Sequence, residues 1–157
     1  QIGGLCGYQL KEINKIKKKE NNSIFLDFFI PWGWATWSKN WIKYTKERKF
    51  ILKKNKINKK NYFENFLCKK IKNKPKKIWT AKFILFNLLQ KNKFIFPSST
   101  LSKNIGFDGS GINSKVTNNL SVIEDKKIIA NFNVIKINKT FQKTQYRILK
   151  KKLIFFY

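Results

Sequence analysis

Histidine and methionine are absent from the sequence, and its 157 residues include only eight acidic residues, two cysteines and three prolines. Without histidine, the chain supplies neither an imidazole base nor a histidine ligand for a metal. Two cysteines in 157 residues exclude a disulfide-rich mini-domain, and Cys6 and Cys68, which form no CxxC motif, are predicted to be reduced thiols. The apolar runs are far shorter than the roughly 20 residues that span a bilayer, and no signal-peptide pattern is visible. These features predict a cytoplasmic protein.

Negative charge is scarce, because 8 Asp and Glu stand against 35 Lys and Arg, for a net charge of +27. Only Arg48 and Arg147 are arginine, whereas a nucleic-acid surface favours arginine for its bidentate contacts. Lysine is abundant together with Asn, Ile and Phe, which favours a bias toward A- and T-rich codons as its origin. The charge nevertheless attracts polyanions and anionic membranes. A Lys-rich nucleic-acid or ribosome-associated protein and a membrane-surface module therefore remain as alternatives.

The aromatic content of 16% and the apolar content of 42% predict a folded core in one domain rather than disorder. Short apolar runs predict a strand within residues 1–8, an extended segment at 24–30 and a strand at 93–96 that ends at Pro97. Apolar residues at helical spacing predict helices at 62–71 and from Trp79 to about Asn92. We expect a mixed α/β fold with few strands.

The segment WGWATW, residues 32–37, places three tryptophans in six positions. Trp34, Trp37 and Trp41 are spaced i, i+3 and i+7, which predicts one buried face of a helix. Trp32 and Gly33 precede that helix, and glycine there permits a sharp bend and close approach of a ligand. Core packing and a ligand-lining role are both compatible with the Trp32–Trp34 trio.

A second segment, NIGFDGSG at residues 104–111, combines glycines with polar side chains. Glycine-rich loops can hold phosphate through exposed N–H groups. The segment is neither a GxGxxG motif in a βαβ unit nor a P-loop ending in GK[ST]. An ordinary turn around Asp108 and Gly109 is the alternative. The carboxylates are too few and too scattered to form a DxD pair, and no complete active site is evident from spacing.

Taken in order, four segments resemble the C-terminal half of bacterial family 2-like glycosyltransferases with the GT-A fold. QIGGLCGY is similar to the family's strand ending in Ser-Gly-Tyr, and PWGWATWSKNWIKY matches its WGWATW helix almost residue for residue. IWTAKF is similar to an SWAYRW-type segment, and FPSSTLSKNIGFDGSG to the family's later Asn-Ile-Gly-Phe run. The resemblance covers residues 1–114, and residues 115–157 form a Lys-rich C-terminal extension.

The resemblance implies a fold class and a function. The fold is α/β, the acceptor side of a GT-A-like fold without its N-terminal nucleotide-binding half. The function is transfer of a sugar from a nucleotide-sugar donor to a glycan or lipid-linked acceptor in cell-surface polysaccharide synthesis. A divalent metal, Mg or Mn, is expected for the full-length family, with no metal ligand in this chain. The family's Thr-His after GSG is Ile112-Asn113 here, and we expect no transferase activity from this chain alone.

The same resemblance implies site residues and partners. The partners that it implies are the nucleotide sugar and the glycan acceptor. The basic charge separately predicts peripheral contact with an anionic membrane, at its inner face, and the scarcity of arginine predicts no specific nucleic acid. Asp108 and Asp27 are the only carboxylates near the two motifs and are the candidate catalytic residues, Asp108 for polar contact with the substrate and Asp27 as the base that activates the acceptor hydroxyl. We predict that Trp32 and Trp34 border an open cleft, that Trp37 and Trp41 are buried, and that NIGFDGSG faces the same cleft. The candidate substrate-binding residues are Trp32, Gly33, Trp34, Asn104, Gly106, Gly109 and Ser110.

Overall fold

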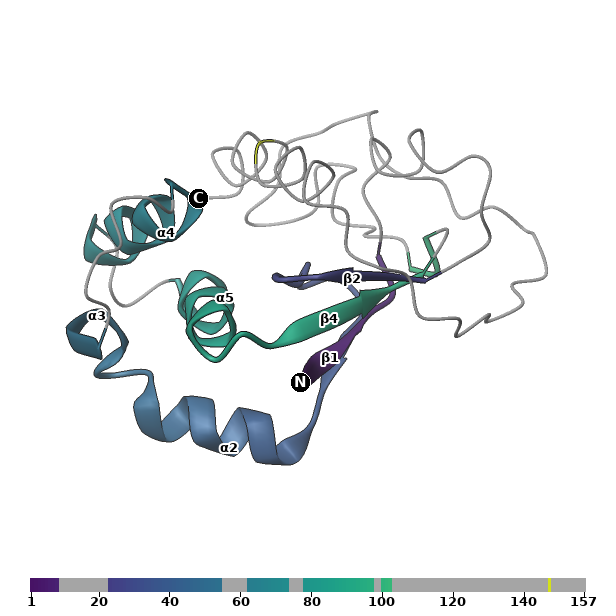
Figure 1. Ribbon diagram of the computed structural model, residues 1–157, viewed down its shortest axis with the longest axis horizontal. Helices are drawn as coiled ribbons and strands as arrows, with labels where there is room; N and C mark the ends of the chain where they lie inside the picture. The colour runs from purple at the N-terminus through teal and green to yellow at the C-terminus, as the bar shows by residue number, and fades with distance from the viewer. Residues whose placement is uncertain (9–22, 55–61, 74–77, 98–99, 103–146, 148–157) are drawn as a thin grey trace, which may run out of the picture.

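The computed structural model of the chain describes residues 1–8, 23–54, 62–73, 78–97, 100–102 and 147 (Figure 1). In these residues the chain forms a mixed four-stranded sheet with its helices gathered to one side. The strands are β1 (Ile2–Cys6), β2 (Ile24–Leu26), β3 (Trp34–Thr36) and β4 (Lys93–Phe96), and the helices are α2 (Ser38–Glu47), α3 (Ile51–Lys54), α4 (Tyr62–Asn73) and α5 (Trp79–Leu89). The mixed α/β class that the sequence predicts is confirmed. The predicted boundary after residue 114 lies outside the described residues.

The sheet has the strand order β2-β4-β1-β3. The central strands β1 and β4 are parallel, whereas β3 pairs antiparallel with β1 and β2 pairs antiparallel with β4. The carboxyl ends of β1 and β4 therefore meet at one edge of the sheet, which we call the carboxyl edge. Since β3 runs the opposite way, its first residue, Trp34, lies at this same edge.

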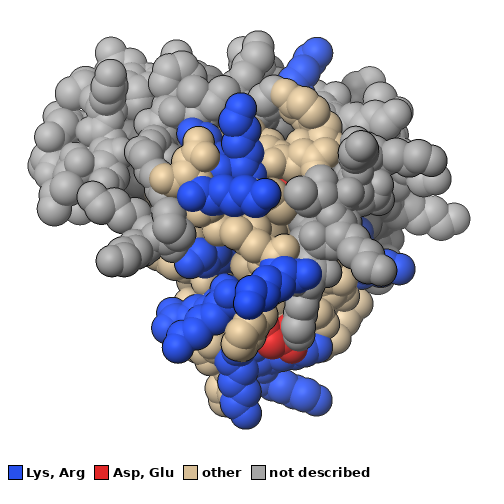
Figure 2. Space-filling model, turned by 90° about the vertical axis from the view of Figure 1, so that its left-hand side faces the viewer, with Lys and Arg blue, Asp and Glu red and all other residues tan. Residues whose placement is uncertain are grey.

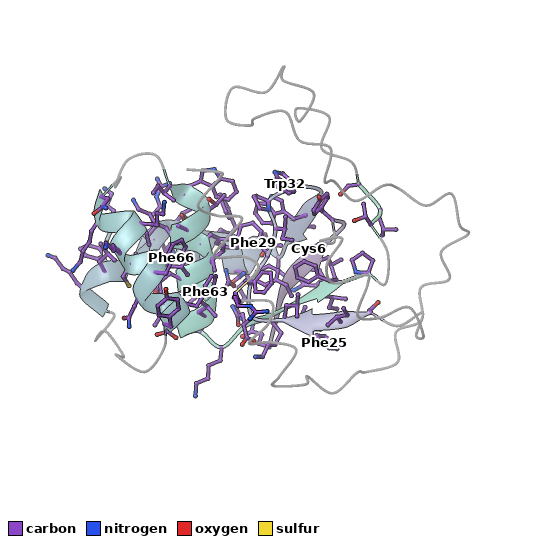
Figure 3. The ribbon with its side chains drawn as sticks, turned by 90° about the horizontal axis from the view of Figure 1, so that it is seen from above. Cys6, Phe25, Phe29, Trp32, Phe63 and Phe66 are labelled. Carbon is purple, nitrogen blue, oxygen red and sulfur yellow. The ribbon has the colours of Figure 1, made fainter. Side chains whose placement is uncertain are left out.

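Helix α5 is the centre of the core, and it lies between α2 and α4 in Figure 1. Nearly every residue from Thr80 to Asn87 is buried, because the helix meets the sheet on one side and other helices on the rest. Phe83 packs edge-on against Phe29 with 5.0 Å between ring centroids, and it also contacts Phe94 of β4. Figure 3 shows Phe63 and Phe66 among the helices, whereas Cys6 and Phe25 lie on the strands and Phe29 and Trp32 lie on the sheet side of the molecule.

The predicted tryptophan stripe on one helix is wrong. Trp34 belongs to strand β3, and α2 begins only at Ser38. The face of α2 that turns inward carries Asn40 and Tyr44, so Trp37 and Trp41 remain 53% and 37% exposed rather than buried. The reason is tertiary: the Thr36 hydroxyl and the Asn40 amide both donate to the carbonyl of Gly3 in β1, which sets the rotation of the helix against the sheet.

Candidate functional site

Three segments far apart in sequence meet at the carboxyl edge of the sheet. Gly7 and Tyr8 follow β1, residues 100–102 follow β4 after a short gap, and Trp32 with Gly33 leads into β3. Ligands of α/β proteins commonly bind outside the carboxyl ends of parallel strands, where loops rather than regular structure supply the contacts. This edge is therefore the candidate site.

Hydrogen bonds join the three segments directly. The Gly7 amide donates to the Gly33 carbonyl at 2.5 Å, and the Leu101 amide donates to the Gly7 carbonyl at 2.7 Å. The Ser102 hydroxyl donates to the Trp32 carbonyl at 3.3 Å. The chain that precedes NIGFDGSG is thus held against the WGWATW segment, although about 70 residues separate them in sequence.

Gly33 is required by the backbone at this edge. Its φ angle of +59° is in the left-handed region, which residues with a side chain rarely adopt. A Cβ atom on Gly33 would lie 2.6 Å from the Ser102 oxygen and 2.7 Å from the Ser102 Cβ. Glycine therefore allows both the turn before β3 and the close approach of Ser102, and its backbone is exposed.

Trp32 and Trp34 are each half-buried, but their rings contact different parts of the molecule. The Trp32 ring meets the buried Tyr8 ring edge-on, with 4.8 Å between centroids, so it belongs to the carboxyl edge. The Trp34 ring instead packs on the core side against Phe29 at 4.8 Å and Phe83 at 5.5 Å. Neither tryptophan is fully enclosed, and of the two, Trp32 is the one placed among the segments of the candidate site.

Asp27 lies at the opposite edge of the sheet. It follows Leu26, which pairs with Phe94, and its carboxylate forms an ion pair with Lys93 at the start of β4. Lys93 at the start of β4 is four residues from Pro97 at the carboxyl edge, which is about 13 Å along a strand. Partial burial lowers the pKa of Lys93. The structure therefore does not bring Asp27 together with Trp32 and Gly33.

The other predicted site residues, Asn104, Gly106, Asp108, Gly109 and Ser110, lie outside the described residues. The described chain reaches Ser102, two residues before the motif begins. The bond from Ser102 to Trp32 holds this last described residue at the candidate site, and the shared cleft stays a prediction.

The donor set of the described residues does not suit a divalent cation. Within that part of the chain, no three His, Cys, Asp or Glu side chains lie close enough to hold a metal. Mg²⁺ and Mn²⁺ need several oxygen ligands, usually including carboxylates, and Asp27 is paired with Lys93 instead. We therefore find no ligand among the described residues for the divalent cation that the family resemblance implies.

Three buried asparagines form a polar cluster near the start of β1 that the sequence did not reveal. The Asn40 amide donates to the Asn87 side-chain oxygen at 3.1 Å, and the Asn92 amide donates to the same oxygen at 2.9 Å. Asn87 donates to the Phe83 carbonyl at 2.8 Å. Gly3 lies against this cluster, since a Cβ there would be 2.9 Å from the Asn87 oxygen. The cluster ties α2, α5 and β1 together, and its members are too scattered in sequence to form a motif.

Two groups near the core have raised pKa values. Burial raises the pKa of the Cys6 thiol to about 12, although a hydrogen bond with the Ile30 backbone acts to lower this pKa. Burial also raises the pKa of the Tyr44 phenol to about 12, and its hydroxyl donates to the Trp79 carbonyl at 3.1 Å. Cys6 and Cys68 are both buried thiols, so neither is a candidate nucleophile at neutral pH.

The chain matches no family model, no curated protein and no solved structure. None of the described helices is long and apolar enough to cross a membrane. The fold and the carboxyl edge therefore carry the functional interpretation.

Proposed function

We propose that this chain is the acceptor-side part of a GT-A-like sugar transferase and that its carboxyl edge binds the acceptor glycan. The observation that supports the proposal is the meeting of the two motif-bearing segments, through the bond from Ser102 to the Trp32 carbonyl. The bond places the chain two residues before NIGFDGSG against the WGWATW segment, and a binding site shared by the two motifs requires such proximity.

The chemistry of the edge suits a sugar. The half-buried Trp32 ring supplies an apolar surface for the carbon-bound hydrogens of a pyranose ring, and the exposed Gly33 backbone lets the ring approach closely. Asn104 and Ser110 supply hydrogen bonds to hydroxyl groups, and Asp108 is the carboxylate proposed to accept the proton of the acceptor hydroxyl. Asp27 is a structural ion-pair partner in this proposal.

A glycan array tests the proposal. The labelled chain should bind a subset of bacterial surface oligosaccharides, and Trp32→Ala should lower that binding by about ten-fold or more, because the stacking surface is lost. Trp37→Ala is the matched control, since Trp37 is exposed away from this edge. Circular dichroism establishes that both variants are folded. Equal losses in both variants, or no binding by the unmodified chain, would contradict the proposal.

A further inference from the structure

Large apolar side chains stand exposed along α2 and at the start of α5. Ile42 is 52% exposed and Trp79 is 42% exposed, and both lie with Trp37 and Trp41 in what we call the aromatic ridge. The Trp41 and Trp79 ring centroids are 6.2 Å apart, so the ridge is continuous between the two helices. Ile42 lies about 160–200° around the helix from the buried Asn40 and Tyr44, so it points straight outward. Such a patch commonly marks an interaction surface.

Lysines border the ridge on the same helix. Three exposed lysines lie next to Ile42 on the outer face of α2, namely Lys39, Lys43 and Lys46. Lys43 donates a hydrogen bond to the Gln90 side chain. Glu47 is the one acidic residue of α2, at its last position. Figure 2 shows Lys and Arg side chains spread over the helical side of the molecule, with acidic atoms at little of its surface.

We propose that the aromatic ridge docks on an anionic lipid surface. Tryptophan is favoured at the boundary between lipid headgroups and hydrocarbon, and lysine stems lie along apolar surface while their ammonium groups reach anionic headgroups. The Trp37 indole N–H is already bonded to the Ile2 carbonyl at 3.0 Å, so its ring enters an apolar layer without an unsatisfied donor. The basic border and the net charge of +27 complement anionic lipid.

The ring geometry favours a lipid surface over a stacked ligand. Trp41 stands at 79° to Trp79 and at 51° to Trp34, so it forms no parallel pair with either tryptophan that could hold a planar base between two rings. Apolar insertion is not directional and tolerates tilted rings. Lysine is also depleted at protein interfaces, which disfavours a protein partner here.

Docking through the ridge leaves the glycan-binding edge accessible. Trp37 follows β3 and is bonded to Ile2 at the start of β1, which is the opposite end of the strand from Gly7. The Trp37 end of the ridge therefore lies at the other edge of the sheet from the glycan contact, and the two contacts use different residues, so they can be tested separately.

Vesicle co-sedimentation tests the inference. The chain should bind vesicles of 70% phosphatidylcholine and 30% phosphatidylglycerol, bind pure phosphatidylcholine weakly, and show a blue shift of tryptophan fluorescence on binding. Lys39→Gln with Lys46→Gln should lower the partition coefficient about 25-fold, from about five-fold for each lysine. Ile42→Asp should lower it at least about five-fold, because apolar insertion is lost.

Helix α4 supplies matched controls. Lys69→Gln with Lys72→Gln removes the same charge from exposed positions, and Tyr62→Asp replaces an exposed large side chain by the same carboxylate as Ile42→Asp. These variants should bind within about two-fold of the unmodified chain, and circular dichroism should show every variant folded. The inference is overturned if the controls lose binding equally, because that pattern indicates diffuse charge. It is also overturned if Ile42→Asp has no effect while homopolymer RNA competes fully, because the surface then binds polyanions in general.

Discussion

Replacing Gly33 with alanine tests the contact that joins the two motif-bearing segments. The substitution places a side chain at a φ angle of +59°, which costs about 1–2 kcal/mol for a residue other than glycine. The new Cβ would also lie 2.6 Å from the Ser102 oxygen and 2.7 Å from the Ser102 Cβ. Rotating the serine side chain moves only the oxygen, so the backbone of one segment must shift.

Overpacking of this kind costs about 1–3 kcal/mol, so Gly33→Ala should lower the free energy of unfolding by about 2–5 kcal/mol in total. Ser102→Gly removes both atoms that the new Cβ would meet. In a Ser102→Gly background, Gly33→Ala should therefore cost only the backbone part, about 1–2 kcal/mol. The difference, about 1–3 kcal/mol, is the coupling between the two positions.

Urea unfolding followed by tryptophan fluorescence measures all four corners of this double-mutant cycle. Ser102→Ala is the control, because it keeps the Cβ atom and removes only the hydroxyl that donates to the Trp32 carbonyl. Gly33→Ala should cost nearly as much in that background as in the unmodified chain. An equal cost of Gly33→Ala with Ser102 and with Gly at position 102 would refute the contact.

Three further predictions concern residues outside the contact between Gly33 and Ser102. Asn87→Leu should lower stability by about 1–3 kcal/mol in urea unfolding, because two buried amides each lose one of their acceptors; a loss below about 0.5 kcal/mol would contradict the polar cluster. Asp27→Asn should lower the free energy of unfolding by about 1–2 kcal/mol, and Lys93→Met should restore part of this loss. Glycan binding should stay unchanged, whereas lost glycan binding with unchanged stability would assign Asp27 to the site. Since burial raises the pKa of Cys6 from 9.0 to about 12, its contribution to stability is complete below pH 9 and is lost as the pH rises toward 12. With rising pH over this range, the urea midpoint of the Cys6→Ala variant should fall less steeply than that of the unmodified chain. Parallel curves of midpoint against pH would contradict the buried thiol.

Elements that end in an unambiguous residue were predictable from the sequence. Pro97 ends β4 because proline lacks the amide needed to continue the ladder, and the predicted strand at 93–96 is confirmed. The helical spacing of Phe63, Phe66 and Leu67 predicted α4, which spans Tyr62–Asn73. The strand at the start of the chain is confirmed as β1.

Features that depend on long-range contacts were not predictable. The spacing of Trp34, Trp37 and Trp41 fits a helix, yet pairing with β1 holds Trp34 in a strand. Periodicity cannot detect such pairing, because the partner strand lies about 30 residues away. Asn87 likewise shows no local signal, since the amides that donate to its side-chain oxygen come from α2 and from Asn92 beyond the end of α5.

Fluorine NMR of the chain labelled with 5-fluorotryptophan tests the proposed glycan site most directly. The five tryptophans give separate resonances that can be assigned by replacing each with phenylalanine. On titration with neutral trisaccharides of hexose or N-acetylhexosamine, the Trp32 resonance should shift saturably while that of Trp37 stays fixed, and Gly33→Ala should abolish the shift. A Trp32 resonance that stays fixed while Trp37 or Trp79 shifts would contradict a glycan site at the carboxyl edge.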